Sequence, residues 1–484
     1  MGSYFYDNYD EDDYLDDNYD DLHEIFMKYS QIASWTDIYG SCVLPSILQI
    51  SRYVIPFLVA NIVLCIVAKL KTRLFPSYNF IMHILSFGSG SYLLYHYLDG
   101  GYIYLVHLVV TTYLLLRISF IDQHYIRFDY TISSYAILCL IVGELHEKDP
   151  KLWHHIRGVL MIIVMKVISL AFDMKTEQSL RKHFTMLAFL GYVCCPANCI
   201  FGPWTSFSEH LTTLTKAKKR FKVNINYFLQ LVLNLVLSMS CLVFSNCVEV
   251  LFVPAYYWKW VTAYGSAFAF RMSHYFVSFL SQATMVSAGF KTKKVNAIQK
   301  STENYLGYNV VHPLSIELPR SILHVVVAWN VPMHHFLKRY VFRPLKPHGT
   351  FVAVLLTYVV SSLLHGLNFQ LWATLLTLGL WSYVEYNIRK KLAQAFSACV
   401  LVSRCQEPCV NHVIGRKRPL SILINSIFFC LTVTNLIYLG MIFDTNSQLQ
   451  TEGFSMKHTI SKWQRLNFVS HLLLVAGFLF NLVI

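Results

Sequence analysis

Long stretches of apolar residues recur along the chain from residue 43 to the C-terminus, with few gaps longer than a loop. A helix that crosses a hydrocarbon core of about 30 Å needs about 20 such residues. We expect roughly ten to twelve membrane segments, because Pro, Gly or a polar residue shortens or interrupts several stretches. Clear examples are Val54–Ala68, Gly158–Phe172, Tyr227–Phe244, Phe351–Leu364 and Ser421–Phe443. The pattern predicts an all-α, polytopic integral membrane bundle that forms one domain over residues 41–484.

The N-terminal segment has a different composition. Asp7–Glu24 is acidic and rich in Tyr and Asn, with no apolar core and no basic flank. It therefore lacks the features of a cleavable signal peptide. A segment of this kind buries too little apolar surface to fold alone. We expect residues 1–40 to form an acidic disordered tail, and an arm that binds a partner is the alternative.

Charged residues are few and the net charge is positive. Of the 484 residues, 55% are hydrophobic and 14% are charged, and the net charge is +13. Soluble domains carry about a quarter charged residues. The basic residues lie in short clusters at the ends of apolar stretches, which is typical of cytosolic loops that meet anionic lipid headgroups. The clusters are Lys69–Arg73, Lys216–Lys222, Lys291–Lys294, Lys338–Lys346, Arg389–Lys391 and Arg416–Arg418.

This charge pattern has two consequences. It indicates membrane lipids, and no nucleic acid, as the partners of the basic residues. With Lys69–Arg73 in the cytosol, the acidic tail lies on the lumenal side if one helix separates the two.

Most of the twelve cysteines lie inside apolar stretches, where a thiol is a small buried hydrophobic group. No disulfide framework can be deduced from their spacing. The densest group is Cys399, Cys405, Cys409 and His412, which lacks the paired C-x2-C spacing of a zinc module. A metal site, S-acylation of a juxtamembrane cysteine and plain thiols are all compatible with it. We expect plain thiols, and no metal at the functional site.

One apolar region is interrupted by closely spaced Pro and Gly. The interruption runs from Cys194–Pro196 to Phe201–Trp204. Non-helical backbone at membrane depth persists only where protein or a water-filled cavity covers it, so a re-entrant loop is one interpretation. A kink between two ordinary membrane spans is the other. No internal repeat is visible, which disfavours an inverted-repeat transporter.

Two polar side chains lie inside otherwise apolar stretches and beside weak points in a predicted helix. His365 precedes Gly366, and Asn330 lies two residues before Pro332. Such residues are functional candidates, although an interhelical hydrogen bond is the structural alternative. An imidazole can accept a proton from an alcohol, and an amide can donate a hydrogen bond to a carbonyl that gains negative charge. Together they can support acyl transfer to a hydroxyl.

No nucleophile for a covalent intermediate accompanies this pair. The neighbouring sequence contains neither a Ser in a G-x-S-x-G turn nor a cysteine nucleophile motif. We therefore favour direct transfer without an acyl-enzyme.

The sequence around both residues resembles a known family. The run W-N-V-P-M-H-H-F-L-K-R-Y-V-F at Trp329–Phe342, followed by S-S-L-L-H-G at Ser361–Gly366, is similar to the signature of the membrane-bound O-acyltransferase family. The resemblance spans most of the chain from about residue 190 onward. Further similar stretches are Phe201–Phe207, Tyr275–Thr284, Glu317–Ser321, Tyr383–Ala393, Ser397–Cys405 and Tyr438–Asp444.

The resemblance implies a helical membrane fold and assigns His365 as the catalytic base and Asn330 as the group that polarises the thioester carbonyl. The residues that it implies as neighbours shaping the substrate site are Trp329, Tyr340, Tyr358, Ser361 and Leu364. The most similar branch of the family implies transfer of a palmitoleoyl group from palmitoleoyl-CoA, as substrate, to a serine of Wnt proteins in the endoplasmic reticulum membrane. No cofactor is implied.

Two other functions stay open. One is an acyltransferase of the same family that modifies a different secreted peptide. The other is a channel or transporter, in which the buried polar residues line a solute path. The lack of repeats and of a paired intramembrane acid disfavours the transporter.

Overall fold

The computed structural model describes residues 35–74, 79–121, 128–215, 225–248, 258–291, 306–405, 409–443 and 455–484, and these are mostly helical. Of the acidic tail expected at residues 1–40, the part up to residue 34 lies outside the described residues. Trp35–Ile38 is already helical and leads through η1 (Tyr39–Val43) into α3. No named β-strand occurs in the described ranges, where Ala398 and Ile414 form an isolated parallel bridge.

The long helices follow the apolar stretches of the sequence. The α-helices of at least 15 residues are α3 (Leu44–Leu74), α4 (Asn79–Leu98), α5 (Tyr102–Ile121), α6 (Phe128–His146), α7 (Pro150–Thr176), α11 (Ile225–Val243), α13 (Lys259–Ser287), α18 (Thr350–Leu364), α19 (Phe369–Ala395), α20 (Pro419–Gly440) and α23 (Val469–Val483). A single helix, α3, thus separates the tail from the basic cluster that begins at Lys69.

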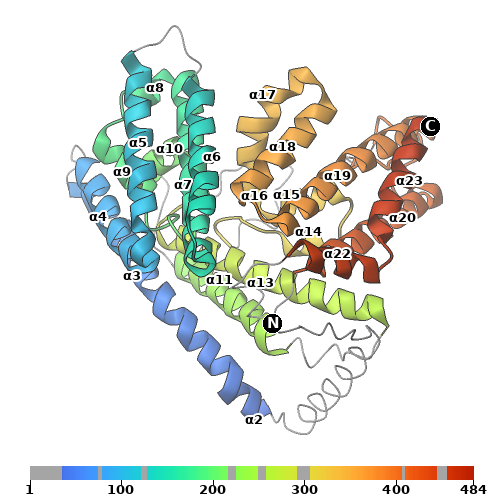
Figure 1. Ribbon diagram of the computed structural model, residues 1–484, viewed down its shortest axis with the longest axis horizontal. Coiled ribbons are helices and arrows are strands. Elements are labelled where there is room, and N and C mark those ends of the chain that lie inside the picture. Colours follow the sequence, from blue (N-terminus) through green and yellow to red (C-terminus); the bar gives the residue numbers. More distant parts are fainter. Residues whose placement is uncertain are drawn as a thin grey trace, which may run out of the picture.

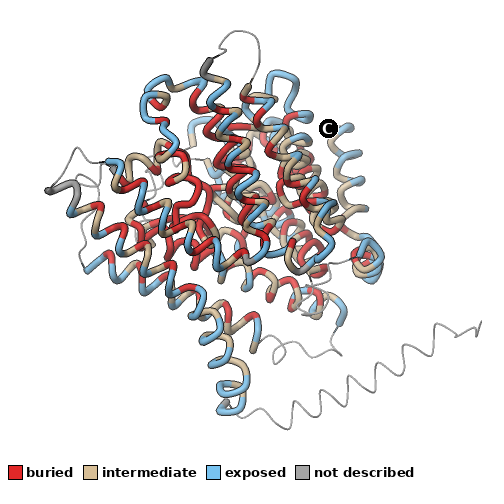
Figure 2. The backbone as a smooth tube through the Cα atoms, turned by 60° about the vertical axis from the view of Figure 1, so that its left-hand side comes forward, coloured by how far each residue is buried: buried red, intermediate tan, exposed pale blue. Residues whose placement is uncertain are grey.

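Six helices in the described ranges are long and apolar enough to cross a membrane. The number is seven if α22 (Met456–Arg465) and α23, which are bent by 76°, form one span. The sequence estimate is higher because it includes shorter and interrupted segments, such as α18 with 15 residues. Figure 2 shows buried residues in the interior and exposed faces outside. Large apolar side chains such as Tyr53, Ile55 and Val59 lie on such faces, as lipid contact requires. The predicted all-α, multi-pass membrane fold is confirmed.

The helices form two flanking groups with a helical hairpin between them (Figure 1). α4 to α7 lie on one side, and α19, α20 and α23 lie on the other. Beneath them run α11 and α13, which pack against each other. The hairpin that contains α16 and α18 lies in the middle, with α18 in contact with both α6 and α19.

A disulfide joins the beginning of α3 to the end of α11. It links Cys42 in η1 to Cys247 in η4 (Phe244–Val248), with a sequence separation of 205 residues. Spacing along the sequence gave no indication of this pair, because its two cysteines come together through the packing of α3 on α11 and of both helices on α13.

The Pro- and Gly-interrupted region lies between two short helices, α9 (Met186–Val193) and α10 (Phe207–Thr215). With eight and nine residues, neither helix is long enough to span a membrane. The intervening residues 194–206 are non-helical and mostly buried. These features favour the re-entrant interpretation over a kink between two ordinary spans.

Lys166 of α7 satisfies the polar groups of this loop. Its buried ammonium donates hydrogen bonds to the carbonyl oxygens of Tyr192 (2.9 Å) and Val193 (3.0 Å) and to Asn198 Oδ1 (2.9 Å). Asn198 in turn donates to Thr205 Oγ1 (2.7 Å). Because backbone acceptors at this depth have no water, the lysine supplies the donors that a helix would otherwise provide.

Lys166→Met is expected to destabilise the protein. The substitution keeps the volume of the stem but leaves buried acceptors unpaired, at about 1–3 kcal/mol each. Thermal unfolding of the detergent-purified protein should therefore begin at a lower temperature. The matched control is Lys182→Met, which changes an exposed lysine that follows α7. Equal melting temperatures for the two variants would contradict this role of Lys166.

Candidate active site

The hairpin in the middle of the molecule consists of two antiparallel helical arms. The first arm comprises α16 (Val331–Leu337), η5 (Lys338–Phe342) and α17 (Arg343–Leu345), which follow one another without a break in helical backbone. The second arm is α18, which has the same length as the first. Residues 346–349 connect them, and Gly349 adopts a φ of 110° that favours glycine.

The two arms have the same number of residues and run in opposite directions. Asn330 immediately precedes the first arm and His365 immediately follows the second, so both lie at the same end of the hairpin (Figure 1). The arms pack against each other along η5 and α17, both of which contact α18. The structure thereby brings the two sequence-predicted catalytic residues to one end of one element.

Asn330 lies at a break between α15 (Ile322–Trp329) and α16, with φ −147° and ψ 91°. Its Oδ1 accepts a hydrogen bond from Met333 N at 3.0 Å and so caps α16. The break is at Asn330 and not at Pro332, because proline is tolerated in the first turn of a helix. Since the cap uses the side-chain oxygen, the amide nitrogen stays available as a donor.

The residue before Asn330 is fixed by α13. The Trp329 ring stacks on the His274 ring, with centroids 4.0 Å apart and an interplanar angle of 12°. His274 Nε2 also donates to the Trp329 carbonyl at 2.8 Å. Both contacts restrain the backbone that orients the Asn330 amide.

His365 lies in a turn that α6 and α19 hold. It is the C-terminal cap of α18, and Gly366 follows with φ 89°. Glu144 of α6 accepts a hydrogen bond from Leu367 N at 2.8 Å and is 3.7 Å from Arg157. Trp372 donates from its indole to the Gly366 carbonyl at 2.7 Å. A Cβ at position 366 would also collide with Glu144 Oε2. Both the positive φ and this close approach therefore favour glycine at position 366.

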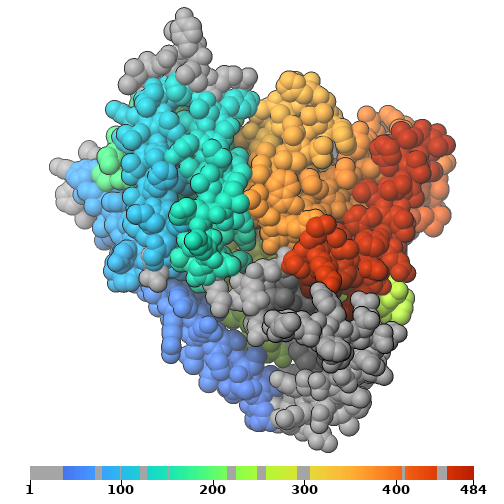
Figure 3. All heavy atoms as spheres, viewed as in Figure 1, coloured from blue at the N-terminus to red at the C-terminus, as the bar shows by residue number. Residues whose placement is uncertain are grey.

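Helices α6 and α7 meet the hairpin along a continuous seam in the space-filling view (Figure 3). There, Tyr340 donates to the Asp173 carboxylate of α7, with oxygen distances of 3.0 and 2.9 Å. The Trp204 ring, which belongs to the re-entrant loop, contacts the Tyr340 ring edge-on. Tyr340 thus anchors the hairpin to α7 and to the loop.

The other predicted neighbours are distributed around the hairpin. Ser361 and Leu364 are buried in the last turn of α18, next to His365. Tyr358, two turns before His365, pairs with Ser382 Oγ of α19 at 3.2 Å. The structure therefore groups Trp329 with Asn330, and Ser361 and Leu364 with His365. It places Tyr340 and Tyr358 further along the arms. Their role in shaping a substrate site stays a prediction.

Sequence reasoning missed several residues that position the pair. Glu144 and Arg157 support the turn of His365, and His274 supports Trp329. A signal was present for Glu144 and His274, since each is an ionisable residue inside a long, largely apolar helix. The rule that selected His365 would also have selected both.

Comparisons with known proteins show the family of the chain. Residues 78–396 match the membrane-bound O-acyltransferase family, a range that includes both Asn330 and His365. The chain is 39% identical to the protein-serine O-palmitoleoyltransferase porcupine of Anopheles gambiae, over 92% of this chain and 93% of the relative. It is 35% identical to the human protein of that name, over 84% and 90%. Lysophospholipid acyltransferase 1 of Arabidopsis thaliana is 25% identical over 43% and 52%. The predicted branch of the family is confirmed.

Proposed function

The chain belongs to the membrane-bound O-acyltransferase family, and from this premise we propose that it transfers a palmitoleoyl group from coenzyme A to a serine hydroxyl of a Wnt protein. The chain is an acyltransferase. The observation that carries the proposed chemistry is the hairpin that places Asn330 and His365 at one end of two equal arms. The names of the relatives support serine as the acceptor and palmitoleoyl as the donor group.

The proposed reaction is a direct transfer. His365 accepts the proton of the serine hydroxyl while the serine oxygen attacks the thioester carbonyl carbon. The amide nitrogen of Asn330 donates a hydrogen bond to the carbonyl oxygen as that oxygen gains negative charge. When the carbon–sulfur bond breaks, the coenzyme A thiolate leaves and receives the proton from His365. The products are the serine ester and free coenzyme A, and no acyl-enzyme forms.

The endoplasmic reticulum is the proposed location. Disulfides persist in its oxidising lumen, and the Cys42–Cys247 bond supports a lumenal position for the N-terminal end of α3. The basic cluster that begins with Lys69, near the other end of α3, then faces the cytosol. The acyl-CoA arrives from the cytosol and the Wnt protein from the lumen, so a site within the bundle lets the two substrates meet.

Co-expression with a Wnt protein tests this function. Mass spectrometry of the secreted and retained Wnt should show a palmitoleoyl mass on a single serine, and none above a matched blank without the chain. A Wnt that stays unmodified, together with acylation of another secreted peptide or of a lysophospholipid by the same membranes, would overturn the acceptor while leaving the enzyme class intact.

The acyl donor gives a further prediction. An apolar tunnel separates chain lengths by about 1–3 kcal/mol per methylene, and a rigid bend also penalises a straight saturated chain that must adopt gauche torsions. With palmitoleoyl-CoA and palmitoyl-CoA at equal concentrations, we expect the unsaturated group to predominate on the serine. The measurement is the ratio of the two acyl masses. A ratio near unity would argue against a bent tunnel without affecting the roles of Asn330 and His365.

A further inference from the structure

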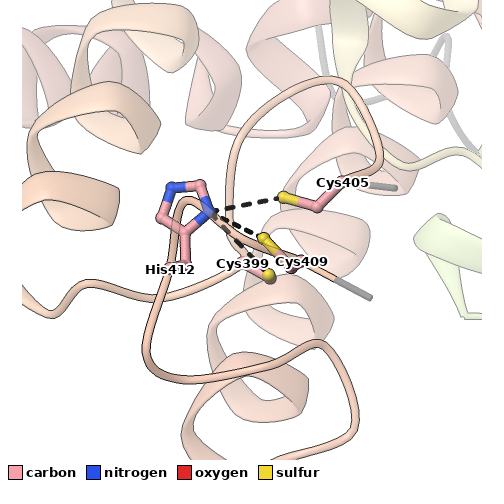
Figure 4. A group of neighbouring side chains, drawn as sticks. All are labelled: Cys399, Cys405, Cys409 and His412. Carbon is pink, nitrogen blue, oxygen red and sulfur yellow. Dashed lines mark hydrogen bonds between the residues drawn. The ribbon is translucent and has the colours of Figure 1, made fainter. Parts of the chain in front are cut away.

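Three cysteines and one histidine converge in the connection between α19 and α20. Cys399, Cys405, Cys409 and His412 each offer one ligand atom, and these four atoms all lie within 4.8 Å of one another. Figure 4 shows the three sulfur atoms directed at the same ring nitrogen, His412 Nδ1. The separations are 3.9 Å from Cys399, 3.6 Å from Cys405 and 3.3 Å from Cys409.

Hydrogen bonding alone does not account for this arrangement. A neutral Nδ1 has either one proton or one lone pair, so it can make one strong hydrogen bond and not three. A cation at the centre of the four ligand atoms accounts for the convergence of all four side chains. In a tetrahedral zinc site with Zn–S of about 2.3 Å and Zn–N of about 2.0–2.1 Å, sulfur and nitrogen are about 3.6 Å apart. The three observed separations lie on both sides of that value.

The loop around the cluster is built into the protein core. Cys399 is fully buried, and its backbone nitrogen donates to the Ile414 carbonyl at 3.0 Å. Arg320 donates to the carbonyl oxygen of Leu401 at 2.9 and 3.1 Å, and Arg389 donates to that of Val400 at 3.0 Å. Cys399 therefore lies in a fixed part of the molecule, where the side chains of the other three residues converge on it.

We propose that Cys399, Cys405, Cys409 and His412 bind one zinc ion as a structural site. Three thiolates and an imidazole are typical zinc ligands, and four protein ligands leave no open position for a catalytic water. The site begins just beyond residue 396, where the match to the family ends, so it adds to the acyltransferase domain. The proposal is independent of which molecule accepts the acyl group.

The ion has a defined structural role in this proposal. By joining Cys399 and Cys405 to Cys409 and His412, it fixes the nearby carbonyl oxygens of Leu401 and Val400, which Arg320 and Arg389 bind. Arg389 also pairs with Glu385 at 2.7 Å, and Glu385 accepts from Ile322 N at the start of α15 at 2.8 Å. Since α15 ends at Asn330, the zinc site stabilises the element that positions the catalytic amide.

The test is the metal content of the full-length protein, purified in detergent with a tag that contains no histidine. Elemental mass spectrometry should find about one zinc per chain. Cys409→Ser and His412→Ala should lose most of it, whereas Cys430→Ser, which changes an exposed cysteine of α20, should retain it. After exchange with Co²⁺, the wild-type protein should show the intense near-ultraviolet absorption of thiolate-to-cobalt charge transfer.

Two results would overturn the proposal, and neither depends on whether a variant folds. One is wild-type protein without stoichiometric zinc whose three thiols react with a maleimide before any chelator is added. The other is a hydroxylamine-sensitive acyl group on Cys405 or Cys409 of the wild-type protein, because a thioester sulfur cannot serve as a thiolate ligand. Protection of the thiols that a zinc chelator abolishes would support the site.

Discussion

His365→Ala is expected to yield a folded, membrane-inserted protein whose rate of acyl transfer falls by a factor on the order of 10²–10⁴, the usual contribution of a positioned general base. Folding should survive because His365 lies at the C-terminal cap of α18, where its backbone and not its ring makes the helix contacts. The measurement is turnover of the purified protein at saturating acyl-CoA, with thermal unfolding as the check on folding.

A control for this change is available on the same hairpin. His348 is exposed in the connection at the opposite end of the two arms, so His348→Ala should transfer acyl groups at the wild-type rate. Near wild-type turnover by His365→Ala would remove the base assignment and leave His365 as a structural residue.

Asn330→Asp is expected to reduce turnover by about 10²–10³, the effect of removing one donor to a developing oxyanion, while α16 keeps its cap. Aspartate caps a helix about as well as asparagine, because only the side-chain oxygen is needed. The amide nitrogen, in contrast, is replaced by an acceptor that cannot stabilise negative charge. We therefore expect Asn330→Asp to lose most of its turnover while its melting temperature changes little.

The matched control is the same substitution at another helix start. Asn368 caps α19 through its Oδ1, which accepts hydrogen bonds from Gln370 N (2.9 Å) and Leu371 N (3.3 Å). Asn368→Asp should keep that cap and most of the activity. If the two variants lost activity equally, a general effect of added negative charge would explain the result better than a donor at Asn330.

The apolar pattern was sufficient to predict the fold class, and the two polar residues inside it indicated a candidate pair whose catalytic roles stay predictions. Apolar stretches are local, and each of the clear examples coincides with a helix, apart from residues 441–443 after the end of α20. The partners of the pair could not be predicted, because Glu144 and Leu367 are 223 residues apart in sequence and meet only when α6 packs on α18. The Cys42–Cys247 disulfide escaped prediction for the same reason.

The basic clusters and the cysteine cluster show that the burial and contacts of individual side chains could not be predicted from their position in the sequence. Arg389 counted as part of a cytosolic cluster, yet it is fully buried and paired with Glu385. Cys399, Cys405 and Cys409 were expected to be plain thiols because their spacing lacks the zinc pattern. Spacing alone does not show that all three sulfurs lie within 3.9 Å of His412 Nδ1, which is the contact on which the zinc proposal depends.

The equal arms of the hairpin restrict how this region can change in length during evolution. One residue inserted into either helical arm would rotate everything beyond it by about 100° and shift it by about 1.5 Å. Such a change would turn Asn330 or His365 out of its present orientation, even though every side chain of the site was retained. An insertion in the connection at residues 346–349 would leave both ends in place. Length variation among functional descendants of this sequence is therefore expected to accumulate in the connection and to be excluded from the arms.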